Sequence, residues 1–553
     1  MKYREEQFRN EPQEDFSNPK VHARIEEAVR YIDSKRLDML KPCPILIGGK
    51  EYYTKEYIEV YDPADCYKIF GKVCKTTPEL LARACTVAEQ AFRKSQELFW
   101  DDFDGWLHRR KHVVRNAVSF IREERYHIAT IIAHEVSKSI KGALGEVEEA
   151  IDFGELYLRH IDDVFVRVYS RPDLVSEKNI RIPLPKGPIA AISVWNFPFS
   201  LSVEKIFAAY LTGCPVLFKP AEQSPIIGYY LARLLLRAGM EADFIAYLPG
   251  HGDTGEALVR HRFVSGVCFT GSMSVGHKIN TAAALSVADD PYGYPYGIKR
   301  FEPELGANNP MIVTRSANLD DVIKAVLRSK WEQQGEKCSA LQRLIIVAEP
   351  KHEFSVSATS RIIDAASSLE YGHPANRKKK YNYNAVIDRN AFDRIKKRIA
   401  DCAEIKQPLL AVDLSHMEEC GYFIGPQIFE GIPHDSPLVG EEIFGPVLFI
   451  FFAGTLKEAI LLANAYPHIT AGIYSQSEEE KKQFVRGMVT GGKSGLIYVN
   501  REIIGAVAGQ HQFGPMNQSG SGYKLGTKDR LHFFINEAGI CENYMSQGVL
   551  FTA

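Results

Sequence analysis

The sequence predicts an α/β protein built on parallel sheets, and three observations lead to this class. From about residue 185, short apolar stretches alternate with helical stretches of about a dozen residues, a pattern typical of βαβ units. A second block of the same kind runs from about residue 305 to 500. The length of 553 residues exceeds what one core needs, so two or three domains are expected at about 150 residues each.

The first part of the chain is predicted to be mostly helical. A helical pattern covers residues 20–40, and short strand-like runs follow at 45–47 and 57–61, separated by glycine and Asp-Pro turns. Pro78 opens a long helical region that reaches about residue 160 with breaks, because apolar residues recur there at helical spacing.

The alternating blocks follow. In the first block, Ser224 and Pro225 begin a helix as N-cap and first-turn residue, and the helix ends at Gly239. The strands expected in this block cover 189–194, 216–219, a run ending at 248, and 264–269. The segments 165–185 and 533–551 lie outside both blocks, and either is a candidate for pairing with another subunit.

Composition narrows the class of function. Hydrophobic content of 45% and charged content of 25% are those of an ordinary soluble globular protein. The net charge of -2 argues against nucleic acid as a partner, and the one dense basic run, at 377–380, is interpreted as a solvated loop. The ten cysteines show neither the close spacing of a metal site nor a disulfide framework, which indicates a reducing compartment and no metal.

The sequence also predicts a location away from membranes. The N-terminus has no apolar secretion segment, and its acidic residues suit an organellar transit peptide poorly. No apolar run approaches the ~18 residues that span a bilayer. We expect a cytoplasmic protein; the mitochondrial matrix stays open if the sequence is a mature form.

Cys338 is the residue around which the rest of the site is organised. It lies in a polar, glycine-containing loop between a helical pattern over 319–331 and an apolar run over 344–347. A thiol between Lys337 and Ser339 could be held as a nucleophilic thiolate. Alone, such a cysteine is more often an inert surface thiol.

Two further motifs suit a nucleotide. Gly271 and Ser272 join a strand to a helix start, where backbone N–H groups can meet a phosphate, although a plain tight turn is an equal alternative. Lys219 and Glu222 follow another strand and could grip both hydroxyls of a ribose. The carboxylate of Glu222 would repel a 2′-phosphate, which favours NAD over NADP; the alternative is a surface ion pair.

Three motifs suit the chemistry of a carbonyl group. Asn196 follows a strand and could donate a neutral N–H to a developing oxyanion, or it could simply shape a Phe-Pro turn. Glu304, expected on a loop before the apolar run 311–313, could serve as a general base if its pKa is raised. Glu442 and Phe444 could supply a hydrogen bond to a sugar and a stacking wall.

Taken in order along the chain, these motifs strongly resemble the aldehyde dehydrogenase superfamily. The 34 residues between Glu304 and Cys338 match the family's usual separation of base and nucleophile. The resemblance covers about residues 40 to 545. Within the superfamily the chain is most similar to the 1-pyrroline-5-carboxylate (L-glutamate γ-semialdehyde) dehydrogenases, through motifs at 8–12, 149–153, 337–340, 500–506, 512–514 and 526–534.

The resemblance implies a fold and an organisation. It implies a Rossmann-like NAD-binding domain (1–164 and 186–303), an α/β catalytic domain (304–515), and a small β-flap with a C-terminal tail for oligomerisation (165–185 and 530–553). It also implies a homodimer or a higher homo-oligomer of dimers, and a small-molecule aldehyde as the partner.

The resemblance also implies a reaction and a set of site residues. The expected reaction is NAD-dependent oxidation of L-glutamate γ-semialdehyde to L-glutamate through a thiohemiacetal and a thioester on Cys338, a step of proline degradation. The implied catalytic residues are Cys338, Glu304 and Asn196. The implied NAD-binding residues are Trp195, Lys219, Glu222, Gly250, Gly271, Ser272, Glu442 and Phe444. The implied substrate-binding residues are Glu149, Phe197, Lys337, Ser339, Gly526, Thr527 and Phe534, of which Gly526 and Thr527 form a loop that anchors the substrate α-carboxylate.

The sequence departs from the family pattern at four places. Ala307 and Glu336 stand where Gly and Gln are usual, the turn at 514–517 lacks its second glycine and basic residue, and an insertion occupies 291–297. Two alternatives therefore remain: an aldehyde dehydrogenase for another aldehyde, and a non-catalytic scaffold with the same fold. Retention of Cys338 and Glu304 argues against the scaffold.

Overall fold

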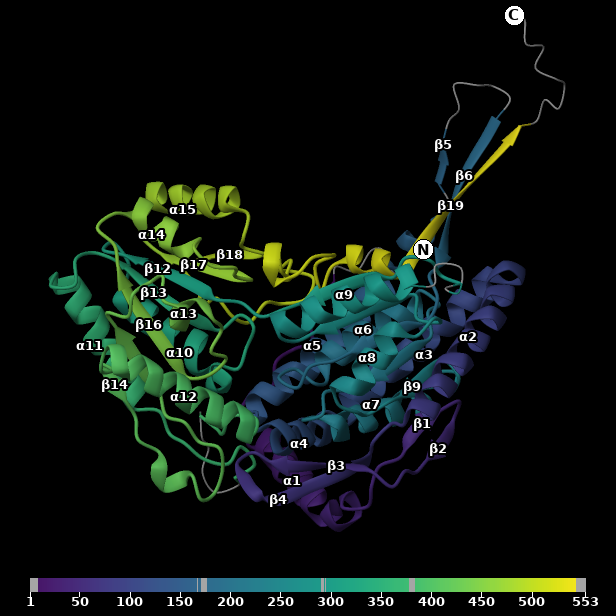
Figure 1. The fold of residues 1–553 in the computed structure, drawn as a ribbon, viewed down its shortest axis with the longest axis horizontal. Coiled ribbons are helices and arrows are strands. Elements are labelled where there is room, and N and C mark those ends of the chain that lie inside the picture. The colour runs from purple at the N-terminus through teal and green to yellow at the C-terminus, as the bar shows by residue number, and fades with distance from the viewer. Residues whose placement is uncertain are drawn as a thin grey trace, which may run out of the picture.

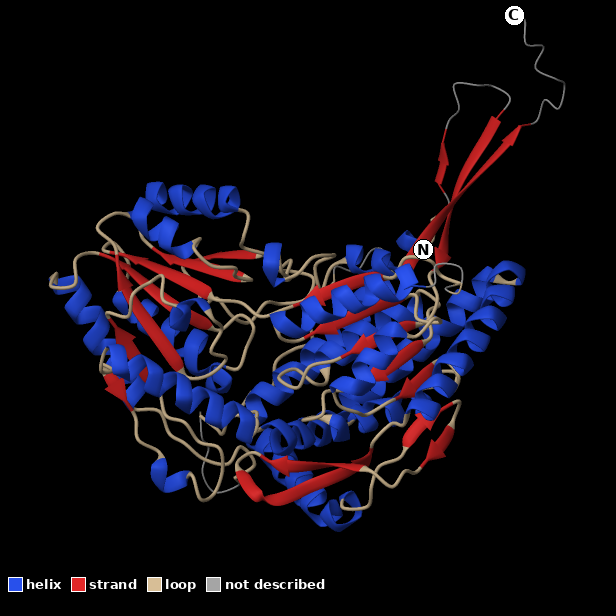
Figure 2. Ribbon diagram, viewed as in Figure 1, coloured by secondary structure: helices blue, strands red, loops and turns tan. Residues whose placement is uncertain are grey.

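The computed structural model describes residues 8–166, 168–170, 177–289, 293, 295–376 and 383–543. It contains two seven-stranded sheets with helices packed against them, a two-stranded ribbon and a three-stranded arm (Figures 1 and 2). The predicted α/β class with parallel sheets is confirmed.

The N-terminal elements match the predicted pattern closely. They are α1 (Pro19–Met39), β1 (Ile45–Ile47), β2 (Lys50–Tyr52), β3 (Tyr57–Asp62) and β4 (Asp65–Cys74). Four helices then cover the predicted helical region: α2 (Pro78–Asp101), α3 (Phe103–Glu123), α4 (Arg125–Val136) and α5 (Ile140–Val164). Helix α2 begins where Thr77 caps it with its hydroxyl and Pro78 sets the first turn, as the sequence favours.

The first large sheet has the strand order β11-β10-β7-β8-β9-β1-β2. Its parallel strands are β7 (Ile189–Ile192), β8 (Val216–Lys219), β9 (Ile245–Tyr247), β10 (Gly266–Thr270) and β11 (Arg300–Glu304), and β1 joins β9 in the antiparallel sense. Its helices are α6 (Ser200–Leu211), α7 (Pro225–Arg237), α8 (Gly252–Arg260) and α9 (Met273–Asp289). The central strands are buried throughout, which explains their continuous apolar sequence.

Helix α7 is capped differently from the prediction. Ser224 is its N-cap residue, but its hydroxyl makes no capping hydrogen bond and is buried without a partner among the described residues. The carboxylate of Glu135, from α4, accepts the N–H groups of Ile226 and Ile227 at 2.6 and 2.9 Å instead. A carboxylate at this position also complements the positive end of the helix dipole.

The second large sheet has the order β14-β15-β16-β13-β12-β17-β18. All its pairings are parallel except that between β14 and β15. Its strands are β12 (Asn309–Thr314), β13 (Leu341–Val347), β14 (Leu410–Ala411), β15 (Gln427–Glu430), β16 (Val447–Phe452), β17 (Thr470–Tyr474) and β18 (Leu496–Val499). Its helices are α10 (Leu319–Trp331), α11 (Glu353–Ser367), α12 (Arg389–Ile405), α13 (Pro437–Gly440), α14 (Leu456–Ala463) and α15 (Glu478–Gly491).

The two segments that lay outside the alternating blocks pair with each other. Strands β5 (Val168–Ser170), β6 (Glu177–Pro185) and β19 (Ile535–Asn543) form an antiparallel sheet in the order β19-β6-β5. Figure 1 shows this arm projecting away from both large sheets. Residues 544–553 and the basic run at 377–380 lie outside the described residues.

Some expected strand boundaries shift by one or two residues, and one expected loop is a strand. The strand predicted over 189–194 ends at Ile192, and that predicted over 264–269 is β10, at Gly266–Thr270. Glu304, expected on a loop, is the last residue of β11, because that strand pairs with β10 along its whole length. In the described part of the chain no helix combines the length and the apolarity needed to cross a membrane.

Candidate active site

Glu304 and Cys338 come from the two different large sheets. Glu304 ends β11 at the edge of the first sheet, where it pairs with Thr270 of β10. Its backbone carbonyl accepts the Gly271 N–H at 3.0 Å. Cys338 lies in the loop between α10 and β13 of the second sheet. The strand ends of two sheets therefore meet at this site.

Asn309, the first residue of β12, fixes the cysteine loop. Its Nδ2 donates to the carbonyl oxygens of Cys338 and Ala340 at 2.7 and 2.9 Å. Its Oδ1 accepts the backbone N–H groups of Ile469 and Thr470, both at 3.0 Å. The four hydrogen bonds of this buried amide thus join the cysteine loop to the beginning of β17, a role that was not identified from the sequence.

Asn196 is held against the same loop. Gln333, whose backbone has a positive φ of 55°, donates from Nε2 to the Asn196 carbonyl at 2.8 Å. Asn196 in turn donates one amide hydrogen from Nδ2 to the Glu336 carbonyl at 2.9 Å. An amide nitrogen carries two hydrogens, and the second has no acceptor among the described residues; its donation to an oxyanion stays a prediction.

The surroundings of Cys338 favour the thiol over the thiolate. Burial raises its pKa to about 12, and the nearby carboxylates of Glu304, Glu442 and Glu149 add to the effect. The ammonium of Lys337 donates to Glu332 Oε1 at 2.7 Å. The expectation that Lys337 holds Cys338 as a thiolate is therefore wrong. The thiol must lose its proton to a base, or the negative charge must be balanced by a bound cation.

Glu304 has the properties of a base that works near neutral pH. Burial raises the pKa of its carboxyl to about 8, and the positive charges of Lys205 and Lys524 oppose part of that rise. Its Oε1 has no hydrogen-bond partner among the described residues. A buried carboxylate with a free oxygen and a pKa near the working pH suits general-base catalysis.

Lys205 and Lys524 were not identified from the sequence. Lys205, on α6, donates from Nζ to Thr270 Oγ1 at 2.8 Å and to the Leu201 carbonyl at 3.1 Å. Lys524 donates to the carbonyls of Gly514 and Pro515 at 2.7 and 2.8 Å. The signal for Lys205 was present, because it and Glu204 are adjacent charges in an otherwise apolar helix.

Glu336, which stands where a glutamine is usual, behaves as a neutral group. It is fully buried, and burial raises its pKa well above the ordinary value. Its Oε1 accepts the Ile387 N–H at 3.2 Å, while Oε2 has no partner in the described part of the chain. A protonated carboxyl has nearly the shape and charge of the amide that it replaces.

Lys219 and Glu222 lie together at the end of β8. Their charged groups are 3.7 Å apart, and Lys219 also donates to the Pro220 carbonyl at 3.2 Å. The Lys219 side chain is buried, whereas that of Glu222 is 41% exposed. Gly250 lies near the start of α8, where a Cβ would come within 2.1 Å of Thr254 Oγ1. A side chain at position 250 would therefore disturb the beginning of that helix.

The need for glycine at position 271 has a structural explanation that differs from the predicted one. A Cβ at this position would lie 2.4 Å from the Phe269 ring, and its N–H already donates to the Glu304 carbonyl. The Gly271 N–H is thus engaged within the protein, and a phosphate contact by the backbone N–H groups of this helix start stays a prediction. Ser272 accepts the Val275 N–H at 3.4 Å through Oγ, near the beginning of α9.

Glu442, Phe444 and Trp195 lie close to the loop that follows Glu304. Glu442 Oε1 accepts the Ala307 N–H at 3.1 Å, and burial raises the pKa of Glu442 to about 7. A Cβ at Gly306 would lie 2.0 Å from Glu442 Oε2, so this glycine is required, whereas Ala307 is accommodated. The rings of Trp195 and Phe444 meet edge to face, with centroids 5.6 Å apart.

Two of the expected substrate residues, Glu149 and Ser339, lie near Cys338, and a third, Phe197, lies against Lys337. Burial raises the pKa of Glu149, on α5, to about 7, and its charge acts on Cys338. The Phe197 ring has the ammonium groups of Lys138 and Lys337 above it, at 3.8 and 5.9 Å from its centroid. Ser339 is buried directly after the cysteine. Their contacts with a substrate stay predictions.

Hydrogen bonds within the protein hold the expected anchor loop, which consists of Gly526 and Thr527. Gly526 has a positive φ of 65°, and its carbonyl accepts the Gly509 N–H at 2.9 Å. The Thr527 hydroxyl donates to the Lys524 carbonyl at 2.8 Å, so its hydrogen is not available to a substrate as expected. Phe534 is fully buried and packs edge to face on Phe533 at 5.0 Å. Its contact with the substrate chain stays a prediction.

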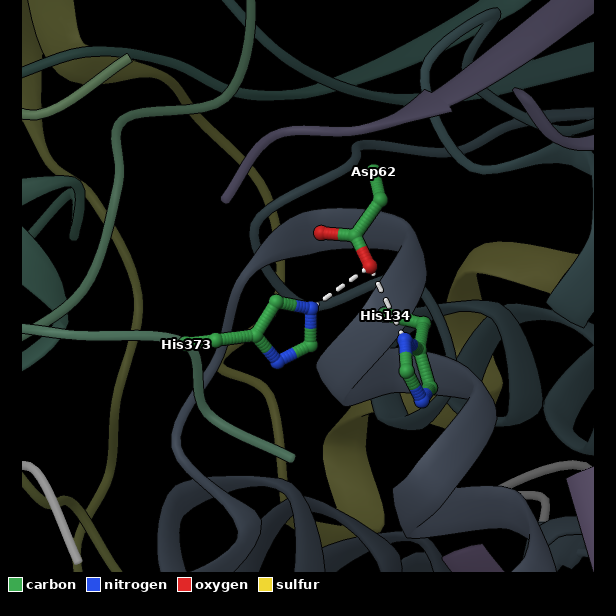
Figure 3. Close-up of side chains that lie close together, drawn as sticks. All are labelled: Asp62, His134 and His373. Carbon is green, nitrogen blue, oxygen red and sulfur yellow. Dashed lines mark hydrogen bonds and ion pairs between the residues drawn. The ribbon is translucent and has the colours of Figure 1, made fainter. Parts of the chain in front are cut away.

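Among the described residues, one cluster of side chains has the composition and spacing of possible metal ligands: Asp62, His134 and His373. Figure 3 shows both imidazoles directed at one carboxylate oxygen: Asp62 Oδ2 lies 2.9 Å from His134 Nδ1 and 2.8 Å from His373 Nε2. A metal-bound histidine normally donates from its other ring nitrogen. His373 Nδ1 instead accepts the Ala375 N–H at 3.0 Å, so its Nε2 carries the hydrogen. The group therefore fits a hydrogen-bonded contact between β3, α4 and the 373 loop better than a metal site.

Comparisons with known proteins agree with this geometry. The aldehyde dehydrogenase family matches residues 51–538. The 1-pyrroline-5-carboxylate dehydrogenase of Geobacillus sp. (strain WCH70) is 29% identical over 97% of this chain and 99% of its own length. 1-Pyrroline-5-carboxylate dehydrogenase 1 of Halalkalibacterium halodurans is also 29% identical, with the same coverage.

Solved structures give the same result. The 1-pyrroline-5-carboxylate dehydrogenase from Thermus with bound NAD is similar with a TM-score of 0.88 and 28% identity, over 97% of this chain and 99% of that one. Proline utilization A from Bdellovibrio bacteriovorus is similar with a TM-score of 0.89, and the chain spans about half, 54%, of that longer protein. On the match to its family, the fold and the site, this chain belongs to the aldehyde dehydrogenase family.

Proposed function

We propose that this protein oxidises L-glutamate γ-semialdehyde to L-glutamate with NAD, through a covalent intermediate on Cys338, as a step of proline degradation. The observation that carries the proposal is that two buried residues lie at the half-buried Cys338: the charge of Glu304 acts on its thiol, and Asn196 is bonded to the loop that contains it. Relatives named 1-pyrroline-5-carboxylate dehydrogenase, which align over nearly their whole length, support the choice of substrate.

The reaction uses the chain's own groups in a defined order. Cys338 releases its proton to solvent as its sulfur forms a bond to the aldehyde carbon, and the oxyanion that forms would accept the second amide hydrogen of Asn196. Bound NAD would accept the hydride, which leaves a thioester on Cys338. Glu304 then takes a proton from water, whose oxygen attacks the thioester carbon. The carbon–sulfur bond breaks, the acid leaves, and Glu304 returns the proton to the Cys338 sulfur, which restores the thiol.

The residues around the site fit NAD. Lys219 is a buried ammonium whose partners among the described residues are one carbonyl and the more distant Glu222, so it retains capacity for ribose hydroxyls. Glu222 puts negative charge where a 2′-phosphate would need a cation, which favours NAD over NADP. Glu442 would bind the second ribose, and Trp195 with Phe444 would form a wall beside the nicotinamide.

The substrate α-carboxylate would be held by backbone N–H groups. The Thr527 N–H donates to no described residue, which leaves it open to an anion. A buried carboxylate needs such donors to replace the water that it loses. A site built for a charged group rejects an uncharged analogue, because its donors are then unpaired.

The organisation of the whole molecule follows from these roles. Residues 1–164 and 186–303 form the NAD-binding domain, 304–515 the catalytic domain, and 165–185 with 530–553 the arm and tail. The outer strand of the arm, β19, has exposed side chains along most of its length. An exposed edge strand offers unpaired backbone groups to another chain, so we assign the arm to a homodimer or a larger homo-oligomer.

The proposed substrate is tested by comparing two aldehydes. We expect kcat/KM for L-glutamate γ-semialdehyde to exceed that for an uncharged aldehyde of similar length by at least ~100-fold, about 2.7 kcal/mol. Thr527→Asp, which places a carboxylate beside the substrate anion, should raise KM for the charged aldehyde only. Equal turnover of both aldehydes by the parent enzyme would leave an aldehyde dehydrogenase for another substrate, and no turnover of either would support the scaffold.

A further inference from the structure

The N-terminal segment before α1 lies against the turn at 508–510, and this turn bonds to the loop proposed to hold the substrate α-carboxylate. Asn10 donates from Nδ2 to Asp152 Oδ2 at 2.7 Å and to the Ala508 carbonyl at 2.8 Å. Its Oδ1 accepts from Gln510 Nε2 at 2.6 Å. This one side chain therefore joins α5 to the turn at 508–510, and the three hydrogen bonds cross 142, 498 and 500 residues of sequence.

The segment is also held along its length. The Glu11 N–H donates to Asp152 Oδ1 at 2.6 Å, so the segment occupies both oxygens of this buried carboxylate. The Glu11 carboxylate pairs with Arg122 and Arg125, each at 2.9 Å. Ion pairs that bind one short segment at several points give it a fixed position. Asn10 is thus presented from a rigid support.

The turn that Asn10 holds also contacts Phe8 of the N-terminal segment. Gly509 has a positive φ of 76°, and a Cβ there would lie 2.6 Å from the Phe8 ring. The N-terminal segment therefore covers this turn directly. On its other side the Gly509 N–H donates to the Gly526 carbonyl at 2.9 Å.

The last bond sets the direction of a donor in the anchor loop. The Gly526 carbonyl and the Thr527 N–H belong to one planar trans peptide, in which they point in opposite directions. Fixing the carbonyl toward Gly509 therefore fixes the Thr527 N–H on the opposite side. This N–H has no acceptor among the described residues, so it is available to donate to a ligand.

We propose that Asn10 is a positioning residue for substrate specificity: through the 508–510 turn it orients the Gly526–Thr527 peptide toward the substrate α-carboxylate. The inference rests on the proposed function, because it needs a substrate with a carboxylate. Asn10 touches neither the reacting atoms nor the substrate. Its loss should weaken recognition of the charged group and leave the chemistry at Cys338 unchanged.

The test compares Asn10→Ala with the parent on two aldehydes. For L-glutamate γ-semialdehyde we expect KM to rise about 10- to 50-fold, with kcat within twofold, because a misdirected donor costs binding of the carboxylate. For an uncharged aldehyde of similar length we expect kcat/KM within twofold of the parent. Asn18→Ala is the matched control: Asn18 caps α1 through its side chain and has no bond to the 508–510 turn.

A second variant distinguishes a loss of positioning from a folding defect in Asn10→Ala. Gln510 is exposed, and Gln510→Ala removes only the bond to Asn10 Oδ1, so it should give a smaller change of the same kind. If the parent discriminates between the aldehydes and Asn10→Ala keeps that discrimination, the inference is overturned while the proposed function stands. Equal losses on both aldehydes also overturn it, as the role is then structural. If the parent enzyme does not discriminate between the two aldehydes, the proposed substrate is wrong, and the inference that depends on it fails as well.

Discussion

Replacement of Lys205 by methionine should shift the pH dependence of the reaction to higher pH. The Lys205 ammonium lies 2.8 Å from Thr270 Oγ1, and Thr270 pairs with Glu304 on the neighbouring strand. Adjacent strands are ~4.8 Å apart, so we place the ammonium roughly 7 Å from the carboxylate. At an effective dielectric constant of ~20, this separation corresponds to roughly 2.4 kcal/mol, or about 1.7 pKa units.

The sign follows from the role of Glu304 as a base. The ionised form is the active one, and the pKa of Glu304 is about 8. Removing a nearby positive charge disfavours ionisation, so the pKa of Glu304 should rise by about that amount. At pH 8 the ionised fraction then falls from about one half to a few per cent, a loss of roughly 20-fold in hydrolysis rate, and at pH 10 the loss should be under about twofold.

The assay is steady-state NADH formation from pH 6.5 to 10. Lys205→Arg should keep the parent profile, because it keeps the charge. Lys186→Met is the matched control, since Lys186 is another buried lysine and its charge does not act on Glu304. A Lys205→Met profile that superimposes on that of the parent would refute the reasoning, because Lys205 would then be neutral in the working enzyme. A loss independent of pH would point to disrupted packing.

Three further changes have expected outcomes. Cys338→Ala should lower turnover by more than ~100-fold while NAD binding, followed by fluorescence titration, persists; substantial residual turnover would exclude the covalent route. Glu222→Gln should narrow the preference for NAD over NADP in kcat/KM, and an unchanged ratio would show that Glu222 does not face the 2′ position. Glu336→Gln should stabilise the protein increasingly as pH rises above 4.5, by up to ~1.4 kcal/mol per pH unit, because the buried parent carboxyl keeps a proton that the unfolded chain loses. Urea unfolding at pH 6 and 8 checks this, and a constant difference between the two proteins would mean that Glu336 is ionised in the fold.

Much of the fold was predictable because local sequence signals coincide with it. The helix over 319–331 and the strands over 45–47 and 216–219 have the bounds that periodicity indicated. Glu304 was placed on a loop because nothing local shows that 300–304 pairs with β10, a contact between distant residues. The same limit applies to α7, whose cap comes from Glu135, about 90 residues earlier in the chain.

The sequence allowed the residues of the site to be named, but not the burial and the charged neighbours of each side chain. The order and spacing of Asn196, Glu304 and Cys338 indicated the family, which the comparisons confirm. The state of Cys338 was not accessible, since it depends on burial and on carboxylates from three other segments. The neighbour in sequence, Lys337, suggested an activated thiolate, yet in space it pairs with Glu332.

The most direct test of the central claim is to trap the acyl group on Cys338. In Glu304→Gln the base that activates water is missing, so NADH should form in a single burst and the thioester should persist. Mass spectrometry of the quenched variant, after mixing with NAD and L-glutamate γ-semialdehyde, should find the γ-glutamyl group on the peptide that contains Cys338 and on no other cysteine. A burst of NADH without an acyl group on Cys338 would contradict the account.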